Sequence, residues 1–136
     1  MARSRRRTPS RLILDSGAVI ALSRGDARAR AFVQRAVEVG AWVEVPAVVV
    51  AETTRGTARD AAVNRVLAAV GEVPSMDEGV ARRAGALLGE TGRDDTIDAL
   101  VVAHAVEAGG GLILTSDLSD VGALAGRHPE VWVERV

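Results

Sequence analysis

The chain of 136 residues carries 17 basic and 18 acidic residues, a net charge of −1, and no cysteine. This length suits one domain with an ordinary hydrophobic core, and the lack of cysteine excludes disulfides and thiolate metal sites. Aromatic residues make up only 2%, too few for a base-stacking platform that binds single-stranded nucleic acid. No apolar run approaches the roughly 20 residues of a membrane span. We therefore expect no membrane association and a cytoplasmic protein.

Basic residues are concentrated at the N-terminus. The first 11 residues hold five arginines and no acid, which leaves 12 basic against 18 acidic residues from Leu12 onward. We expect residues 1–10 to form a basic, disordered tail and residues 11–136 to form a single domain. Because an acidic body repels a polyanion, nucleic-acid binding by this domain requires metal ions, arginine contacts, or both.

The first half of the chain alternates between apolar runs and helical patterns. Residues 12–14 are three large aliphatic residues, which predicts a strand buried on both faces. We then expect a short helix over 18–22, a helix over 26–39 with Asp26 as its N-cap, and a strand over 41–45. Pro46 is unsuited to a central strand but suits the first turn of a helix. The next helix is therefore predicted from Pro46 to Gly56.

The second half continues the alternation. We expect a helix over 58–70, a short third strand over 72–74, and a helix over 78–90 capped by Asp77. After a turn, Asp95 or Thr96 caps a long apolar helix that runs to Ala108. Residues 112–115 predict a second buried strand, followed by a short helix over 121–125 and an edge strand over 131–133. This order predicts an α/β fold with a mostly parallel sheet and helices on both faces.

Four acidic residues lie in apolar segments and outside any run of charge. Two of them directly follow the buried strands, at the edge where open α/β sheets bind ligands. A carboxylate among apolar neighbours is costly unless a cation or hydrogen-bond donors compensate it. Several carboxylates that converge there raise each other's pKa unless a hard divalent cation binds between them. Mg²⁺ or Mn²⁺ suits such ligation by oxygen atoms alone. The four acids are Asp15, Glu52, Asp98 and Asp117.

Three of these acids also have a purely structural interpretation. Asp15 could cap a helix, and Asp117 could form an Asx turn. Glu52 could face solvent and pair with Arg55. Asp98 is the hardest to explain in this way, because its helical neighbours are apolar.

The four motifs, in this order, resemble the PIN-domain family of metal-dependent ribonucleases and, within it, the VapC toxins of bacterial toxin–antitoxin modules. The segments that carry the resemblance are 12–16, 51–55, 97–105 and 112–117. The resemblance implies a PIN-like three-layer sandwich, with a mostly parallel central sheet flanked by helices. It also implies a metal-dependent endoribonuclease that hydrolyses RNA phosphodiester bonds.

The resemblance assigns roles to further residues. The four acids are implied as catalytic residues and as the ligands of one or two Mg²⁺ or Mn²⁺ ions. Thr115 and Ser116 match hydroxyls that orient a carboxylate or a water molecule. Asp95 and Asp120 are expected as accessory acids beside the site. Asp95 is also an alternative to Asp98 as third ligand, and Asp98 is preferred because it lies among apolar residues and precedes Ala99.

The resemblance also implies partners. A VapC-like toxin forms a homodimer and binds an antitoxin whose C-terminal segment blocks the acidic pocket. The apolar segments 18–22 and 47–51 are candidates for that interface. Arg24, Arg55 and the tail are candidate phosphate contacts. Two alternatives remain open: a PIN-like module that binds RNA or a partner without cleavage, and a PIN nuclease that is not a toxin.

Overall fold

Four parallel strands form the centre of the molecule. The computed structural model describes residues 9–136, so residues 1–8 of the predicted tail lie outside the described residues. Strand order is β2-β1-β3-β4, and every neighbouring pair is parallel. Leu12 pairs with Leu112 and Leu14 with Leu114, so both buried runs end at the same edge of the sheet. The strands are β1 (Arg11–Leu14), β2 (Trp42–Glu44), β3 (Gly111–Thr115) and β4 (Val131–Arg135).

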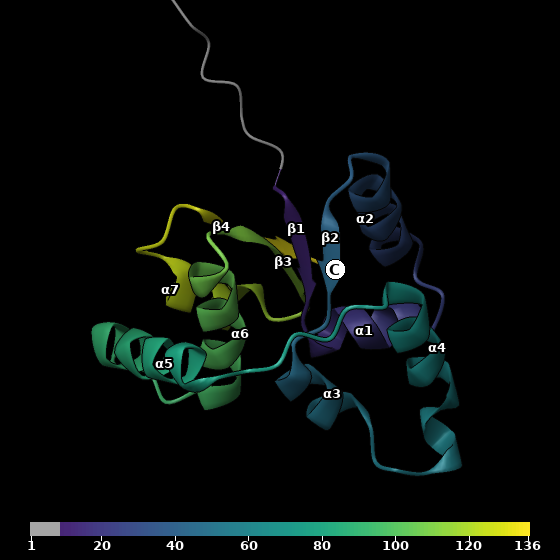
Figure 1. The fold of residues 1–136 in the computed structure, drawn as a ribbon, viewed down its shortest axis with the longest axis horizontal. Coiled ribbons are helices and arrows are strands. Elements are labelled where there is room, and N and C mark those ends of the chain that lie inside the picture. Colours follow the sequence, from purple (N-terminus) through teal and green to yellow (C-terminus); the bar gives the residue numbers. More distant parts are fainter. Residues whose placement is uncertain (1–8) are drawn as a thin grey trace, which may run out of the picture.

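Helices cover both faces of this sheet. Helices α1, α2 and α4 lie on one side and α5, α6 and α7 on the other (Figure 1). The arrangement confirms the predicted three-layer α/β sandwich with a parallel sheet. The bounds are α1 (Ser16–Ser23), α2 (Ala27–Glu38), α3 (Ala47–Thr53), α4 (Ala61–Val70), α5 (Glu78–Thr91), α6 (Thr96–Glu107) and α7 (Leu118–Ala125).

Local sequence signals explain where several helices begin. The carboxylate of Asp26 accepts a hydrogen bond from the Ala29 N–H at 2.9 Å, and that of Asp77 accepts one from Val80 at 3.0 Å. Both caps are as predicted, since a carboxylate satisfies an N–H that has no partner inside the helix. Helix α3 begins directly after Pro46, also as expected.

The predicted third strand over 72–74 is wrong. This segment forms only a single bridge, between Glu44 and Glu72, and the Val45 N–H donates to the Glu72 carbonyl at 3.0 Å. Pro46 and Pro74 lie next along the two segments. The Ala47 N–H still donates to the Pro74 carbonyl at 3.0 Å, but Pro74 has no N–H to return a hydrogen bond, so no second bridge forms.

The region after α3 also differs from the prediction. Helix α3 ends at Thr53 instead of Gly56, and the helix expected over 58–70 opens with a short 3₁₀ turn, η1 (Ala58–Asp60). The buried carboxylate of Asp60 accepts hydrogen bonds from the N–H groups of Arg55, at 3.0 Å, and Gly56, at 2.8 Å. These bonds satisfy backbone donors in a turn, so the helix has an alternative to continuing.

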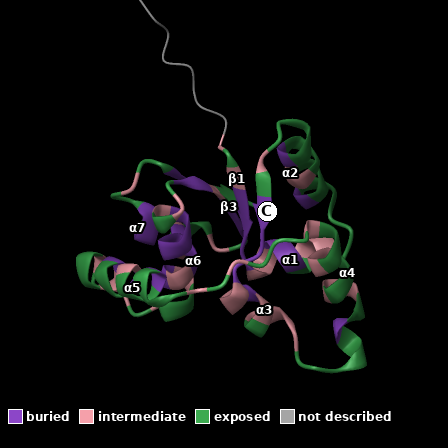
Figure 2. Cartoon of the chain, viewed as in Figure 1, coloured by how far each residue is buried: buried purple, intermediate pink, exposed green. Residues whose placement is uncertain are grey.

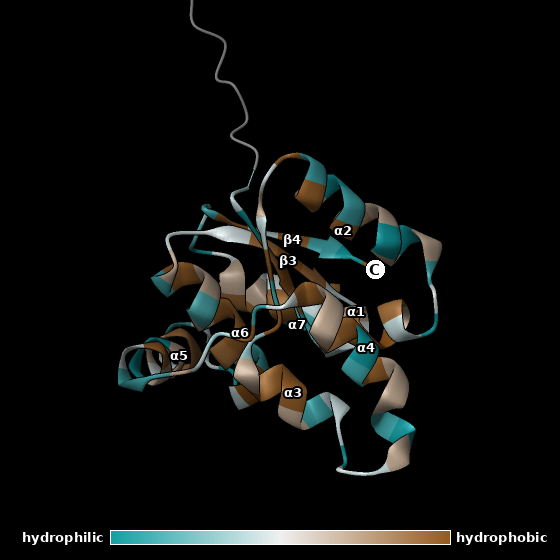
Figure 3. Ribbon diagram, turned by 45° about the vertical axis from the view of Figure 1, so that its right-hand side comes forward, coloured by the Kyte–Doolittle hydropathy of each residue, from teal (hydrophilic) through white to brown (hydrophobic). Residues whose placement is uncertain are grey.

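The core lies on both faces of the central strands. Ile13, Leu14, Ile113 and Leu114 have no exposed surface. Buried residues occupy the strands and the sheet-facing sides of α1, α6 and α7 (Figure 2), and hydrophobic residues gather in the same places (Figure 3). The buried runs predicted at 12–14 and 112–115 are confirmed. Over residues 9–136, no helix has the length and apolar character needed to cross a bilayer.

A buried ion cluster ties the sheet to α6. One carboxylate oxygen of Glu44 lies 2.7 Å from Arg11 Nε and 3.0 Å from His104 Nε2. Burial raises the pKa of Glu44, but the hydrogen bond with His104 and the Arg11 charge lower it by more, so the net pKa is below its ordinary value. These three residues are far apart in sequence and hold β1, β2 and α6 together.

Candidate active site

Two of the predicted acids, Asp15 and Asp117, directly follow the neighbouring strands β1 and β3, or lie one residue beyond. After these two strands the chain leaves the sheet on opposite faces. β1 leads into α1 on one face of the sheet, whereas the adjacent β3 leads into α7 on the opposite face. The chain therefore diverges at the carboxyl edge between β1 and β3. Crevices of this kind are where open α/β sheets bind their ligands.

Asp15 is buried at the end of β1, with 3% of its surface exposed. Its Oδ1 accepts a hydrogen bond from the Ser16 N–H at 2.8 Å and caps α1. Its Oδ2 accepts one from the Thr115 hydroxyl at 2.9 Å. Burial raises the pKa of Asp15, although these two hydrogen bonds oppose the rise, and the charge of Asp117 raises it further. Asp15 thus caps α1, as its structural interpretation predicts, and its role as a metal ligand stays a prediction.

The Thr115 hydroxyl joins the two strand ends. It donates to Asp15 and accepts a hydrogen bond from the Asp117 N–H at 3.0 Å. The side chain of Asp117 in turn accepts from the Asp120 N–H at 3.2 Å and caps α7. Ser116, the other predicted hydroxyl, is exposed. Of the two hydroxyls, Thr115 is therefore the one that donates to a carboxylate, that of Asp15.

Glu52 reaches the site from α3. Its Oε1 is buried and has no hydrogen-bond partner among residues 9–136. Arg55 does not pair with this carboxylate; its guanidinium donates to the carbonyls of Ala51, Glu52 and Thr54. Burial and the charge of Asp15 raise the pKa of Glu52. The interpretation of Glu52 as a solvent-facing partner of Arg55 is wrong.

The pKa of Asp98 is raised by the charges of all three other predicted acids. It lies half-buried in the first turn of α6, and no cationic side chain among the described residues forms an ion pair with it. Burial, followed by the charges of Asp15, Asp117, Asp95 and Glu52, raises the pKa of Asp98 to about 6. The charges of the four predicted acids thus act on one another, and none of the four forms an ion pair within residues 9–136. Within the same residues, however, the acids whose oxygens lie within 4.8 Å of one another are Asp95, Asp98 and Asp120, and not these four.

The two accessory acids have a partner that the sequence did not reveal. Asp95, Asp98 and Asp120 each place a carboxylate oxygen within 4.8 Å of the others. Arg93 Nε donates to Asp95 at 2.9 Å, and its Nη2 donates to Asp120. Arg93 precedes Asp95 by two residues in a predicted turn, but its pairing with Asp120, 27 residues away, carries no local signal.

The predicted phosphate contacts lie at different distances from the acids. Arg55 lines a small hollow together with Glu52, Val48, Ala51 and Ile97. Arg24 follows the last residue of α1, whereas Asp15 precedes its first. Since an eight-residue helix is about 12 Å long, Arg24 is separated from the acids by the length of α1. Arg55 is therefore the better placed of the two.

Comparison with known proteins gives the family. The PIN domain family model matches residues 12–119, about four-fifths of the chain. The chain belongs to the PIN domain family. The matched residues cover most of β1 and all of α3, α6 and β3. They also include the helix caps Asp15 and Asp117. PIN domains are nucleases, and RNA cleavage is the usual activity of the family. No curated protein matches the chain by sequence.

Solved structures share the fold of this PIN domain. VapBC2 from Rickettsia felis, bound to a DNA fragment from its promoter, superposes with a TM-score of 0.72 at 12% identity, over 93% of this chain and 98% of that one. A toxin–antitoxin complex from Klebsiella pneumoniae has a TM-score of 0.66 at 20% identity, over 88% and 94%. DNA-bound VapBC from Salmonella typhimurium has a TM-score of 0.66 at 16% identity, over 92% and 97%.

Proposed function

We propose that this PIN domain is a metal-dependent endoribonuclease and the toxin of a toxin–antitoxin pair. The observation that carries the proposal is the group of four acids at the β1–β3 crevice, which repel one another and form no ion pair within residues 9–136. The family supports nuclease activity. The solved structures that share the fold support the toxin assignment, because they are toxin–antitoxin complexes.

The donor set fits a hard divalent cation. It offers carboxylate oxygens from Asp15, Glu52, Asp98 and Asp117, and Mg²⁺ and Mn²⁺ prefer oxygen ligands. The buried Oε1 of Glu52 has no partner among the described residues, and an unpaired buried oxygen of this kind is costly. A positive charge among these groups removes both the repulsion and the unpaired oxygen. These four residues are therefore the proposed ligands.

The chain's own residues prepare the site for phosphodiester hydrolysis. A bound divalent cation supplies the positive charge that activates water and neutralises developing charge on the phosphate. Thr115 holds one oxygen of Asp15 in place, and the Ser16 N–H holds the other. Arg55 lies beside Glu52 as a cation for the RNA backbone.

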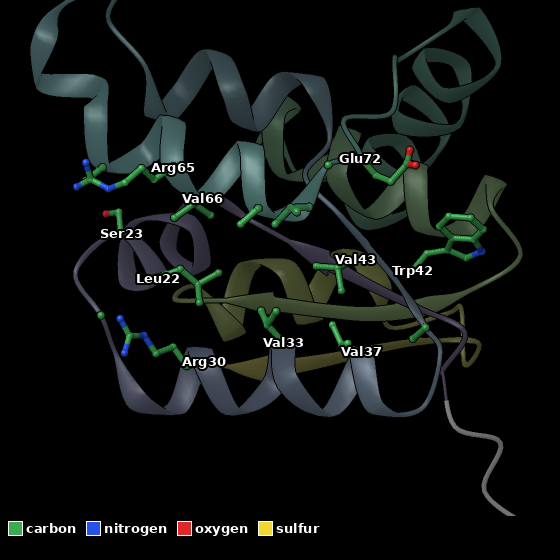
Figure 4. A pocket seen from close by; sticks show the side chains of 16 residues that line it. Leu22, Ser23, Arg30, Val33, Val37, Trp42, Val43, Arg65, Val66 and Glu72 are labelled. Atoms are coloured by element: carbon green, nitrogen blue, oxygen red, sulfur yellow. The ribbon is translucent and has the colours of Figure 1, made fainter.

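A groove at the C-terminal end of α1, at the other end of this helix from Asp15, is the proposed antitoxin site. It has a volume of about 670 Å³ and lies between α1, α2, α4 and β2. Leu22, Val33, Val37, Val43 and Val66 project into it from these four elements (Figure 4). The predicted segment 18–22 thus contributes Leu22, whereas segment 47–51 does not line the groove.

Charged residues mark the two ends of this groove. Arg30 and Arg65 lie at the end near Ser23, and Glu72 lies near Trp42 at the other (Figure 4). We assign the groove to the C-terminal segment of an antitoxin, with apolar side chains along its length and an acidic side chain at the arginine end. Because α1 runs about 12 Å from the groove to Asp15, such a segment is able to continue to the acidic site. The homodimer stays a prediction.

Metal-dependent RNA cleavage tests the proposed activity. We expect the purified chain to cleave RNA with Mg²⁺ or Mn²⁺ and to lose activity in EDTA. Asp98→Asn is expected to lower the cleavage rate by about 100-fold or more, because it removes a charged ligand. The matched control is Asp94→Asn, at an exposed acid four residues earlier in the chain, which should retain activity.

The alternatives give different results in the same assay. Cleavage that persists in EDTA, or in Asp98→Asn, contradicts the proposed site. Mn²⁺ binding without cleavage of any RNA favours the PIN-like binding module. Cleavage that no co-expressed antitoxin inhibits favours a PIN nuclease that is not a toxin.

A further inference from the structure

We infer that Arg93 is a built-in cation that holds Asp95 and Asp120 and limits the acidic site to one divalent ion. The inference rests on the proposed metal-dependent function and concerns how many ions that site takes. It divides the acids into two groups. The inner group is the four proposed ligands, and the outer pair is Asp95 and Asp120.

The outer pair is engaged by one guanidinium. Arg93 Nε lies 2.9 Å from Asp95 Oδ2, and Nη2 donates to Asp120 Oδ1. The Arg93 side chain is 29% exposed, so these contacts are partly shielded from water. Two charge-assisted hydrogen bonds from a planar group are stronger and more directional than ordinary ones. Each bond uses one oxygen of its carboxylate, so a metal ion at this pair would have to lie beside the guanidinium, whose positive charge repels it.

Without Arg93, the same acids have the spacing of a cation site. Asp95, Asp98 and Asp120 each bring an oxygen within 4.8 Å of the others. Asp98 belongs to both sets, because the charges of Asp15, Asp117 and Glu52 act on it together with that of Asp95. A second ion would therefore bind beside the first, with Asp98 between them. Arg93 supplies one positive charge at that place without any ion.

The inner group receives no such help. The described residues form ion pairs from Arg93 to Asp95 and Asp120, and none to Asp98 or Asp117. Glu52 Oε1 likewise has no partner there. Arg93 thus neutralises part of the negative charge of the outer pair, whereas the inner group needs a bound cation for the same purpose. One ion per chain follows from this division.

Counting bound Mn²⁺ tests the inference without any activity measurement. The metal-free full chain is titrated with Mn²⁺ by calorimetry, and free Mn²⁺ is counted by electron paramagnetic resonance. We expect one ion per wild-type chain. Arg93→Met keeps most of the side-chain volume and removes the charge, so it should bind two ions. Adding Asp120→Asn to that variant should return the count to one, because the second site loses a ligand.

A second variant tests the same point with Arg93 in place. Asp95→Asn combined with Asp120→Asn keeps oxygens that accept hydrogen bonds from Arg93 but removes both charges. We expect it to bind one ion with a Kd within about threefold of the wild-type value, a difference of less than 1 kcal/mol. Loss of Mn²⁺ binding in this variant overturns the inference, because the ion then depends on the outer pair.

The remaining outcomes separate the inference from the proposed function. Two ions on the wild-type chain, or one ion on a folded Arg93→Met variant, overturn the role of Arg93 and leave the metal-dependent nuclease intact. A wild-type chain that binds no Mn²⁺ overturns the proposed function itself. Circular dichroism of each variant establishes that the ion count comes from a folded chain.

Discussion

At the scale of single residues, the site is defined by charges that the fold brings together and leaves uncompensated. Asp98 shows this best, since burial and four neighbouring carboxylates all raise its pKa. Asp15 and Glu52 shift in the same direction, chiefly through burial. Each of these shifts favours the neutral acid and opposes the charged form. The acids therefore repel one another at neutral pH, and the proposed cation would remove that repulsion.

The pH dependence of stability follows from Asp98. Its pKa is 3.8 in the unfolded chain and about 6 in the folded chain. Between these values the folded chain holds more protons, so this residue makes the free energy of unfolding fall as pH rises. We expect Asp98→Asn to stabilise the metal-free chain at pH 7 by about 1 kcal/mol, a value reduced because Asp98 is only half-buried. Near pH about 4 the gain should vanish, because Asp98 is then largely protonated in the folded chain.

Thermal unfolding in EDTA, at several pH values, measures this difference between variant and wild type. Added Mn²⁺ should reverse the order, because only the wild-type chain keeps the complete ligand set. Asp94→Asn serves as the control and should shift Tm little at any pH, since Asp94 is exposed. An Asp98→Asn chain that is less stable than wild type in EDTA at pH 7 contradicts the proposed electrostatics.

At the scale of elements, the site depends on how closely the turn after β1 approaches the turn after β3. A Cβ built on Gly17 would lie 2.1 Å from the Ser116 hydroxyl oxygen and 2.9 Å from the Ser116 backbone nitrogen. Only glycine allows this approach. The same two turns carry Asp15 and Asp117, so the first turn of α1 packs directly on the loop that holds the second acid. The carboxylate spacing is thus set by backbone contact.

We expect Gly17→Ala to destabilise the chain by about 1–3 kcal/mol, the usual cost of overpacking, and to lower RNA cleavage by moving the two acids apart. Chemical denaturation and the cleavage assay measure the two effects. Gly85→Ala is the matched control, because a Cβ there meets nothing within 4 Å and alanine favours the helix. It should be neutral or stabilising. Full cleavage by a stable Gly17→Ala chain contradicts the role of this contact.

At the scale of the whole molecule, the two proposed surfaces lie at opposite ends of α1. Asp15 caps its start, and Leu22 and Ser23 at its end line the apolar groove. The groove leaves apolar side chains partly open to solvent, and exposed apolar patches of this kind are typical of protein interfaces. A partner segment in the groove is therefore in position to reach the site along one short helix. Under the proposed function, this arrangement would allow an antitoxin bound in the groove to inhibit cleavage.

A charge in the groove should separate these two functions. We expect Val66→Asp to weaken antitoxin binding by about 100-fold or more, because the carboxylate is desolvated under the bound segment. RNA cleavage by the free chain should remain, since Val66 lies on α4, away from the acids. Asn64→Asp, at an exposed position of the same helix, is the control. Calorimetry with an antitoxin encoded by a neighbouring gene measures the affinity; unchanged binding by a folded Val66→Asp chain places the partner elsewhere.

The sequence alone determined the features that depend on neighbouring residues. Apolar runs at 12–14 and 112–115 specify buried strands, and Asp26 and Asp77 specify helix starts, because each signal acts within a few residues. Since parallel strands present their carboxyl ends at one edge, the meeting of Asp15 and Asp117 also followed from the sequence. The role of the four acids as metal ligands stays a prediction.

Only the tertiary structure decided the contacts between residues that are distant in sequence. The pairing of Arg93 with Asp120 and that of Glu44 with Arg11 and His104 depend on how helices and strands are placed in space. No periodicity encodes such pairs, because many cations and carboxylates are free to meet in an unfolded chain. The wrong prediction of a strand at 72–74 also depends on a contact between segments that are distant in sequence. Its residues suit a strand, but Pro74 has no N–H to complete a second bridge once the two segments lie side by side.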